Sequence, residues 1–145
     1  MMRKMLVAVG VAIGCGAAGS SAVIQAPTPA ATNTPIVRTA KTLSGQPLRL
    51  PQGKAELVAS AVDIPGGGQT TIHRHPWSRF VYVERGPLRI TNLDTGTVDE
   101  LQTGQVFAEV VAQWHQGHAT GPHGARVVVL DLVPPGATNM VMRPN

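Results

Sequence analysis

The chain has 145 residues, with 43 % apolar residues, 14 % charged residues and a formal net charge of +4. This length supports one domain with a core of its own. Two of the 12 basic residues, Arg3 and Lys4, lie in a predicted N-terminal signal, and the remaining 10 exceed the 8 acidic residues by +2. So small an excess argues against a nucleic-acid-binding surface.

The first 22 residues resemble a secretory signal peptide. Arg3 and Lys4 precede a run of small and apolar residues, Leu6–Gly19, and Ala22 ends a stretch of small residues suited to cleavage. We therefore expect residues 1–22 to be removed and the mature protein to be periplasmic or secreted. Contact with a membrane is expected only if the signal stays uncleaved, or if Cys15 is lipidated in a lipoprotein.

The residues after the predicted signal have a different composition. Residues 23–41 are rich in Pro, Thr and Ala and predict a disordered linker, because they offer little apolar surface to bury. Residues 42–145 are then expected to form a single domain. Cys15 is the only cysteine, so a cleaved chain would have neither a disulfide nor a thiol nucleophile.

From about residue 42, short apolar runs alternate with turns rich in Gly, Pro, Asn and Asp, which predicts short β-strands. In chain order we expect strands at residues 56–64, 70–75, 79–84, 88–91, 97–101, 105–111, 125–133 and 139–142. Short strands at this spacing, without a credible helix, predict an all-β fold, either a sandwich or a small antiparallel barrel.

His73 and His75 lie two residues apart in one of these predicted strands. Residues i and i+2 of a strand face the same side, so both imidazoles can point at one place. Neutral imidazole binds Fe, Mn, Zn, Ni and Cu, which makes the pair a candidate site for a divalent transition metal. The spacing alone does not distinguish this site from two surface histidines.

The residues around this pair resemble the first motif of the cupin superfamily. That motif is a Gly, five residues, His-x-His, three or four residues, a Glu, six residues and a Gly. The chain has Gly67, His73, His75, Arg79 and Gly86 at these spacings. Only the Glu is changed, and Arg79 takes its place.

The second cupin motif is matched in part. Gly104 and His115 lie at the spacing of its Gly and its His, whereas Val110, Ala112 and Ala119 stand where the motif has Pro, Gly and Asn. The resemblance covers about residues 45–142. It implies a small single-domain cupin, an antiparallel β-barrel or double-stranded jelly roll. It also makes a homodimer a reasonable expectation.

The resemblance places His73, His75 and His115 on the three histidine ligand positions of the family. Arg79 falls on the carboxylate position and cannot ligate a metal, because its guanidinium stays protonated. In one interpretation the three histidines form an open metal centre and Arg79 holds an anionic substrate group by a forked hydrogen bond. In a second, Glu109 supplies the carboxylate ligand, unless it pairs with Arg79. In a third, the cation prevents tight metal binding.

Other residues near these histidines are further candidates. Gln113 lies beside His115 in sequence and could hydrogen-bond a substrate or a bound water, so it joins Arg79 as a candidate catalytic residue. His118 is expected in a loop, because Gln116 and Gly117 are expected to break the strand. The candidates for an apolar substrate pocket are Trp77, Tyr82 and Trp114.

The sequence leaves three functions open. The first is a dioxygenase-like or isomerase-like enzyme that acts on a small organic anion. The second is a non-catalytic module that binds a small ligand or a metal in the same pocket, and the third is a purely structural barrel. A serine hydrolase is unsupported, because the chain has no nucleophile elbow and no Ser-His-Asp arrangement.

Overall fold

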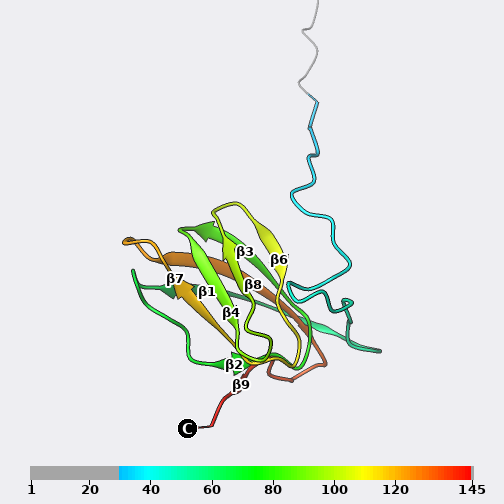
Figure 1. Ribbon diagram of the computed structural model, residues 1–145. Coiled ribbons are helices and arrows are strands. Elements are labelled where there is room, and N and C mark those ends of the chain that lie inside the picture. The colour runs from blue at the N-terminus through cyan, green and yellow to red at the C-terminus, as the bar shows by residue number, and fades with distance from the viewer. Residues whose placement is uncertain (1–29, 145) are drawn as a thin grey trace, which may run out of the picture. The chain divides into compact units, whose positions relative to one another are not determined.

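The computed structural model describes residues 30–144, and this part of the chain contains nine β-strands and no helix (Figure 1). The strands are β1 (Glu56–Ile64), β2 (His73–Arg74), β3 (Arg79–Arg85), β4 (Leu88–Asn92), β5 (Val98–Leu101), β6 (Val106–Ala108), β7 (His115–Ala119), β8 (Ala125–Val133) and β9 (Val141–Met142). Within residues 30–144, no helix is long and apolar enough to cross a membrane. The predicted signal and Cys15 lie outside the described residues.

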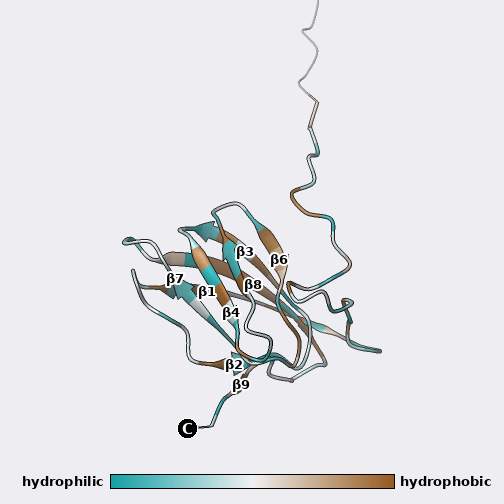
Figure 2. Cartoon of the chain, in the orientation of Figure 1, coloured by the Kyte–Doolittle hydropathy of each residue, from teal (hydrophilic) through white to brown (hydrophobic). Residues whose placement is uncertain are grey.

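The strands form two antiparallel sheets. One has the order β1-β8-β3-β6 and the other has the order β5-β4-β7-β2-β9. This arrangement confirms the predicted all-β jelly roll. Apolar side chains from both sheets, including those of Val81, Val83, Leu88, Ile90, Val127 and Val129, form the core between them. Figure 2 shows the alternation of hydrophobic and hydrophilic residues along the strands that produces this core.

The longest strand illustrates how the sequence pattern selects the inner face. In β8 every second residue from Ala125 to Val133 is buried, and the residues between them are half-buried or exposed. The buried set includes Asp131, which therefore carries a charge into an otherwise aliphatic row. The neighbouring strand β3 repeats this pattern, because Arg79, Val81 and Val83 are buried.

Strand boundaries from the sequence agree with the structure for residues 56–64 and 125–133. The strand expected at residues 70–75 is wrong, because only His73–Arg74 pair regularly in β2. The hydroxyl of Thr70 accepts a hydrogen bond from the backbone N–H of Gly117 at 2.9 Å. A side chain thus replaces a carbonyl as the acceptor, and the regular ladder does not extend through residue 70.

The break expected at Gly117 is also wrong. Residues His115–Ala119 form β7, and Gly117 is buried within it. His118, expected in a loop, lies on this strand opposite Arg89 of β4. A Cβ at Gly117 would lie 3.5 Å from Ile90 and Thr70, which is ordinary van der Waals contact, and Gly117 pairs regularly with Ile90 of β4, so it does not end the strand.

Two turn positions explain features of the cupin-like motifs. Gly86 has a φ of +81°, and a Cβ there would lie 2.1 Å from the carbonyl oxygen of Gly124, so only glycine fits. Ala112 has a φ of +59°, in the left-handed region that disfavours residues with a Cβ. Its backbone N–H donates a hydrogen bond to the carbonyl of His75 at 2.8 Å. The turn at Ala112 therefore lies directly beside the histidine cluster and is strained.

We expect Ala112→Gly to stabilise the protein by about 0.5–1 kcal/mol, because relief of the left-handed strain exceeds the entropy that glycine adds to the unfolded chain. Thermal unfolding should show a rise of a few degrees. The control is Ala61→Gly in β1, an exposed alanine without a positive φ, which should lower stability. Equal or opposite shifts for the two variants would show that the turn is not strained.

Candidate metal centre

Three histidines from two parts of the chain meet between the sheets. His73 on β2 lies directly opposite His115 on β7, and His75 follows β2. All three side chains are buried. Their ring centroids lie 4.5–4.9 Å apart, and one ring nitrogen from each lies within 4.8 Å of the others. The three histidines are therefore positioned for metal binding.

Backbone carbonyls fix the orientation of all three rings. The Nδ1–H groups donate to the carbonyl of Thr71 from His73 at 2.7 Å, to that of Asn139 from His75 at 2.5 Å, and to that of Gln113 from His115 at 2.9 Å. A carbonyl can only accept, so the proton of each neutral ring is on Nδ1. Each Nε2 then keeps its lone pair, as a metal ligand requires.

The protonation equilibria of two rings favour the same state. Burial lowers the pKa of His73 to about 4, although the carbonyl of Thr71 acts in the opposite direction. Burial also lowers the pKa of His115, against the opposing charge of Glu109. Both rings are therefore neutral at neutral pH, because desolvation penalises the charged imidazolium.

Glu109 brings a carboxylate to the same cluster. It follows β6 and is buried, and its backbone N–H donates to the carbonyl of Arg79 at 2.9 Å. Its carboxylate oxygens lie 2.9 Å from Nε2 of His75 and 3.7 Å from Nε2 of His115. Burial would raise the pKa of Glu109, but His75, His115 and Arg79 together lower it to about 2, so the carboxylate is charged.

Three buried atoms at the centre of this cluster have no hydrogen-bond partner. They are Nε2 of His75, Nε2 of His115 and Oε2 of Glu109. A proton on His75 would satisfy that ring and the carboxylate, but it would leave Nε2 of His115 unpaired. One metal ion would satisfy all three atoms, and unpaired buried polar atoms are costly. The residues present thus fit a divalent transition metal with nitrogen and oxygen ligands.

Arg79 is held by a partner that the sequence did not suggest. Its Nε and one terminal nitrogen donate to the two carboxylate oxygens of Asp131 at 2.8 and 2.7 Å. The two residues are direct neighbours across β3 and β8. The Nε of Arg79 is 4.0 Å from Glu109, so this contact is much weaker than the pair with Asp131. Asp131 therefore neutralises the charge of Arg79 and occupies the edge of the guanidinium that forms the two parallel hydrogen bonds.

Asn139 connects this ion pair to the histidines. Its side-chain amide donates to Asp131 at 2.6 Å, while its backbone carbonyl accepts from His75. Both Asn139 and Asp131 are buried, and neither was predicted as a site residue. Asp131 had a usable signal, because it falls on the inward face of an apolar strand and a buried charge requires a partner. No such signal existed for Asn139, since its contact with His75 is made by its backbone carbonyl.

A family comparison names the fold around this cluster. The Cupin domain family matches residues 60–131, a span that contains all three histidines, Arg79 and Glu109. The chain belongs to the cupin superfamily. The cupin resemblance of the sequence is thereby confirmed, and the histidine cluster lies inside a cupin jelly roll. A comparison with curated proteins found no match.

Solved structures of other cupin-like proteins share this fold. A conserved protein from Klebsiella pneumoniae with a double-stranded β-helix domain has 18 % sequence identity and a TM-score of 0.51, covering 68 % of this chain and 91 % of its own. The oxalate decarboxylase of Lactobacillus farciminis, solved as a formate complex, has 20 % identity and a TM-score of 0.51, covering 59 % of this chain and 26 % of its own.

An oxalate decarboxylase variant from B. subtilis has 16 % identity and a TM-score of 0.52, with 60 % of this chain and 24 % of its own covered. The cupin chain thus spans only about a quarter of each oxalate decarboxylase. At these identities the likeness concerns the fold.

The other predicted site residues of this cupin have defined places. The side chain of Gln113 accepts a hydrogen bond from Asn92 at 3.0 Å, and its carbonyl orients His115. The ring of Trp114 lies 4.7 Å from the guanidinium of Arg74, in a cation–π contact. Tyr82 is 37 % exposed. Neither Trp77, Tyr82 nor Trp114 is among the residues that line the cavity beside His73.

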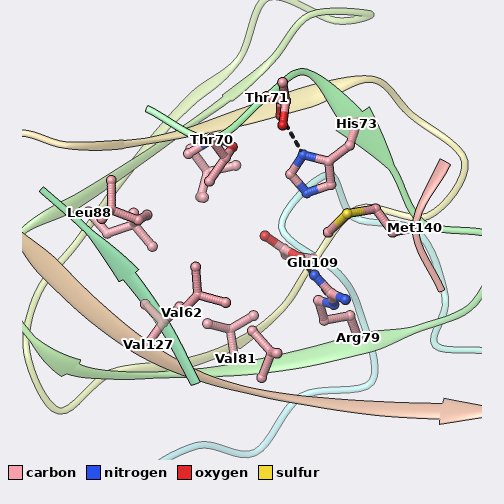
Figure 3. Close-up of a pocket in the computed structure, with 14 residues that line it drawn as sticks. Val62, Thr70, Thr71, His73, Arg79, Val81, Leu88, Glu109, Val127 and Met140 are labelled. Carbon is pink, nitrogen blue, oxygen red and sulfur yellow. Dashed lines mark hydrogen bonds and ion pairs between the residues drawn. The ribbon is translucent and has the colours of Figure 1, made fainter. Parts of the chain in front are cut away.

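That cavity has a volume of about 80 Å³ and lies inside the cupin barrel. Its polar end holds His73, Arg79 and Glu109, with the thioether of Met140 close by (Figure 3). The rest of its wall is mainly aliphatic and includes Val62, Val81, Leu88, Ile90, Val127 and Val129. The cluster thus has one side open to a space that can hold a small ligand.

Proposed function

We propose that His73, His75, His115 and Glu109 bind one divalent transition metal, and that this centre binds a small molecule in the adjoining cavity. The observation that carries the proposal is the set of three buried, unpaired atoms on His75, His115 and Glu109. Their lone pairs converge on one place, and a cation there removes all three penalties at once.

The charges around the cluster permit such a cation. Asp131 neutralises Arg79, and the carboxylate of Glu109 leaves one negative charge beside the histidines. An unneutralised Arg79 would repel a divalent ion by several kcal/mol at an effective dielectric constant of about 20. Structural zinc sites bind their metal with about 10–16 kcal/mol. Repulsion between Arg79 and the metal is therefore smaller than the binding free energy, and Asp131 and Glu109 reduce it further, so it does not exclude the metal.

The protein's own residues would orient and shield the metal. The carbonyls of Thr71, Gln113 and Asn139 hold the three rings by their Nδ1–H groups. Glu109 contributes charge, and burial excludes competing water. When bound, the metal would supply a Lewis acid that polarises an oxygen atom of the ligand. A mixed set of imidazole and carboxylate ligands suits Fe, Mn, Zn, Ni and Cu.

Catalysis by this centre is the second candidate function. It is favoured by the cavity that meets the cluster at His73 and Glu109, because a ligand there can reach the metal. The reaction would be dioxygenase-like or isomerase-like. Oxygen uptake and product formation in the presence of metal and candidate ligands distinguish turnover from binding. Export is proposed from the sequence of residues 1–22 alone.

The test is a metal titration of protein prepared without a histidine tag and stripped of metal. We expect one equivalent of Mn²⁺, Fe²⁺, Co²⁺, Ni²⁺, Cu²⁺ or Zn²⁺ to bind and to raise the unfolding temperature. Glu109→Gln should weaken binding on the order of 100-fold, because it removes one of four ligands that share about 10–16 kcal/mol. Glu100→Gln, which changes an exposed carboxylate paired with Arg89, is the matched control.

Two results would count against this assignment. If none of these metals binds at one equivalent, the proposed metal centre is wrong. If the metal binds but Glu109→Gln and Glu100→Gln bind it equally well, the histidines alone hold the metal and Glu109 has another role. Absorption spectra of the cobalt-loaded proteins report the change in the ligand set independently of affinity.

A further inference from the structure

The wall of the cavity beside His73 has two chemically different parts. One end carries His73, Arg79 and Glu109, and the remainder is formed mainly by aliphatic side chains, with Thr70 and Thr71 near the histidine. Val81, Leu88 and Val129 are each at most 4 % exposed, so this part of the wall belongs to the packed core. A bound molecule would therefore place one end against polar groups and its body against hydrocarbon.

The charges of the polar end disfavour a second anionic group. Among the described residues that line the cavity, Arg79 is the only cation other than histidine, and its forked edge already binds Asp131. Glu109 adds a negative charge at the same end. A second carboxylate placed deeper would meet only aliphatic groups and threonines, and burying a charge without a partner is costly.

The size of the cavity sets the size of the ligand. A volume of about 80 Å³ is room for roughly three to six water molecules, or for an organic group with about as many non-hydrogen atoms. Thr71 and Met140 are exposed residues of the lining, so the cavity reaches solvent beside His73. The unbranched, flexible side chain of Met140 can move aside as a ligand enters.

We propose that the ligand of this centre is a small molecule with one polar head and an apolar body of about three to five carbon atoms. The head lies at His73 and Glu109, and the body lies among Val81, Leu88 and Val129. The same wall disfavours small dicarboxylates such as oxalate, because their second carboxylate would have no polar partner there. The position of the head rests on the proposed metal centre, whereas the apolar body rests on the cavity alone.

The first experiment varies the body at a constant head. Formate, acetate, butyrate, 3-methylbutyrate, octanoate and oxalate are titrated into the cobalt-loaded protein, and the metal absorption bands report binding. Each buried methylene should raise affinity about fourfold, so butyrate should bind on the order of 50-fold more tightly than formate. Octanoate should gain nothing further, because it exceeds the cavity. Oxalate should bind no more tightly than formate.

A second experiment does not depend on the metal. Methyl NMR spectra of the metal-free protein are recorded during titration with 1-butanol, whose body matches that of butyrate. The methyl signals of Leu88, Ile90 and Val129 should shift together, whereas those of the exposed Leu57 should not. If no metal binds but these shifts occur, the metal centre is wrong and the apolar ligand site stands.

A matched pair of variants locates the site. Val129→Phe fills the cavity, whereas Leu130→Phe enlarges the next residue of β8, which is 38 % exposed and faces outward. Val129→Phe should reduce butyrate affinity at least tenfold while the protein still binds one metal ion, and Leu130→Phe should change neither. Retained metal binding shows that Val129→Phe is folded. Should that variant fail to fold, Val129→Thr, nearly equal in size, should lower butyrate affinity but not formate affinity.

Three results would overturn the inference. The first is tighter binding of oxalate than of butyrate, the second is an affinity that does not depend on the length of the body, and the third is absence of methyl shifts with 1-butanol. Each of them can occur in a protein that binds its metal normally. Failure of the ligand proposal is thereby distinguishable from failure of the metal centre.

Discussion

Replacement of His75 or His115 by alanine is expected to lower the affinity for a divalent transition metal by about 10²–10³-fold. Each ring is one of four ligands that share about 10–16 kcal/mol, so the loss of one corresponds to roughly 3–4 kcal/mol. Both side chains are fully buried, and the Nε2 atom of each has no hydrogen-bond partner and faces the carboxylate of Glu109. Competition with a coloured chelator measures the affinity.

The control for this pair is His118→Ala. His118 lies on β7, as does His115, but on the face opposite to the cluster, where it is half-buried and opposite Arg89. Its removal should leave metal affinity within about twofold. If His118→Ala weakens binding as much as His115→Ala does, the metal is held at another place. Unfolding of the metal-free variants shows whether the loss reflects the site or the fold.

Asp131→Ala is expected to destabilise the protein by about 3–5 kcal/mol, the range for breaking a buried ion pair by removing one partner. Arg79 would keep its charge in the core and lose the two hydrogen bonds at 2.8 and 2.7 Å that satisfy it. The amide of Asn139 would lose its acceptor as well. Denaturant unfolding of the metal-free protein measures the change in free energy.

An exposed ion pair provides the comparison. Arg89 and Glu100 pair at 2.5 Å with both side chains more than 40 % exposed, and Glu100→Ala should cost about 1 kcal/mol or less. The double variant Arg79→Met and Asp131→Leu should recover most of the stability that Asp131→Ala loses, because apolar groups of similar volume can replace a buried pair. Equal effects of Asp131→Ala and Glu100→Ala would show that water reaches the Arg79–Asp131 pair.

Much of the fold followed from local patterns. Short apolar runs ended by Gly and Pro predicted the strands at residues 56–64 and 125–133 with the bounds that the structure shows. His115–Ala119 was missed because Gly117 is a poor strand residue by itself. In the sheet, Gly117 pairs with Ile90 of β4, and this long-range pairing, which no local pattern records, keeps it in the strand.

The candidate site also has parts that the sequence predicted and parts that it did not. His73 and His75 could be paired from the sequence, because a spacing of two places both on one side of a strand. The partner of Arg79 could not be found that way, since Asp131 lies 52 residues further along the chain. Their pairing depends on which strands are neighbours and on the register between them. From the sequence, either a substrate or Glu109 could have been the partner of Arg79.

The sequence by itself determined the cupin family, the all-β fold and the three histidines, because these depend on residue type and short spacings. The tertiary structure decided what the exchange of Glu for Arg79 means. The antiparallel register places Asp131 on one side of Arg79. Glu109, which follows β6, lies on the other side. One acid neutralises the cation and the second faces the histidines, because contacts between distant strands are set by packing of the whole sheet.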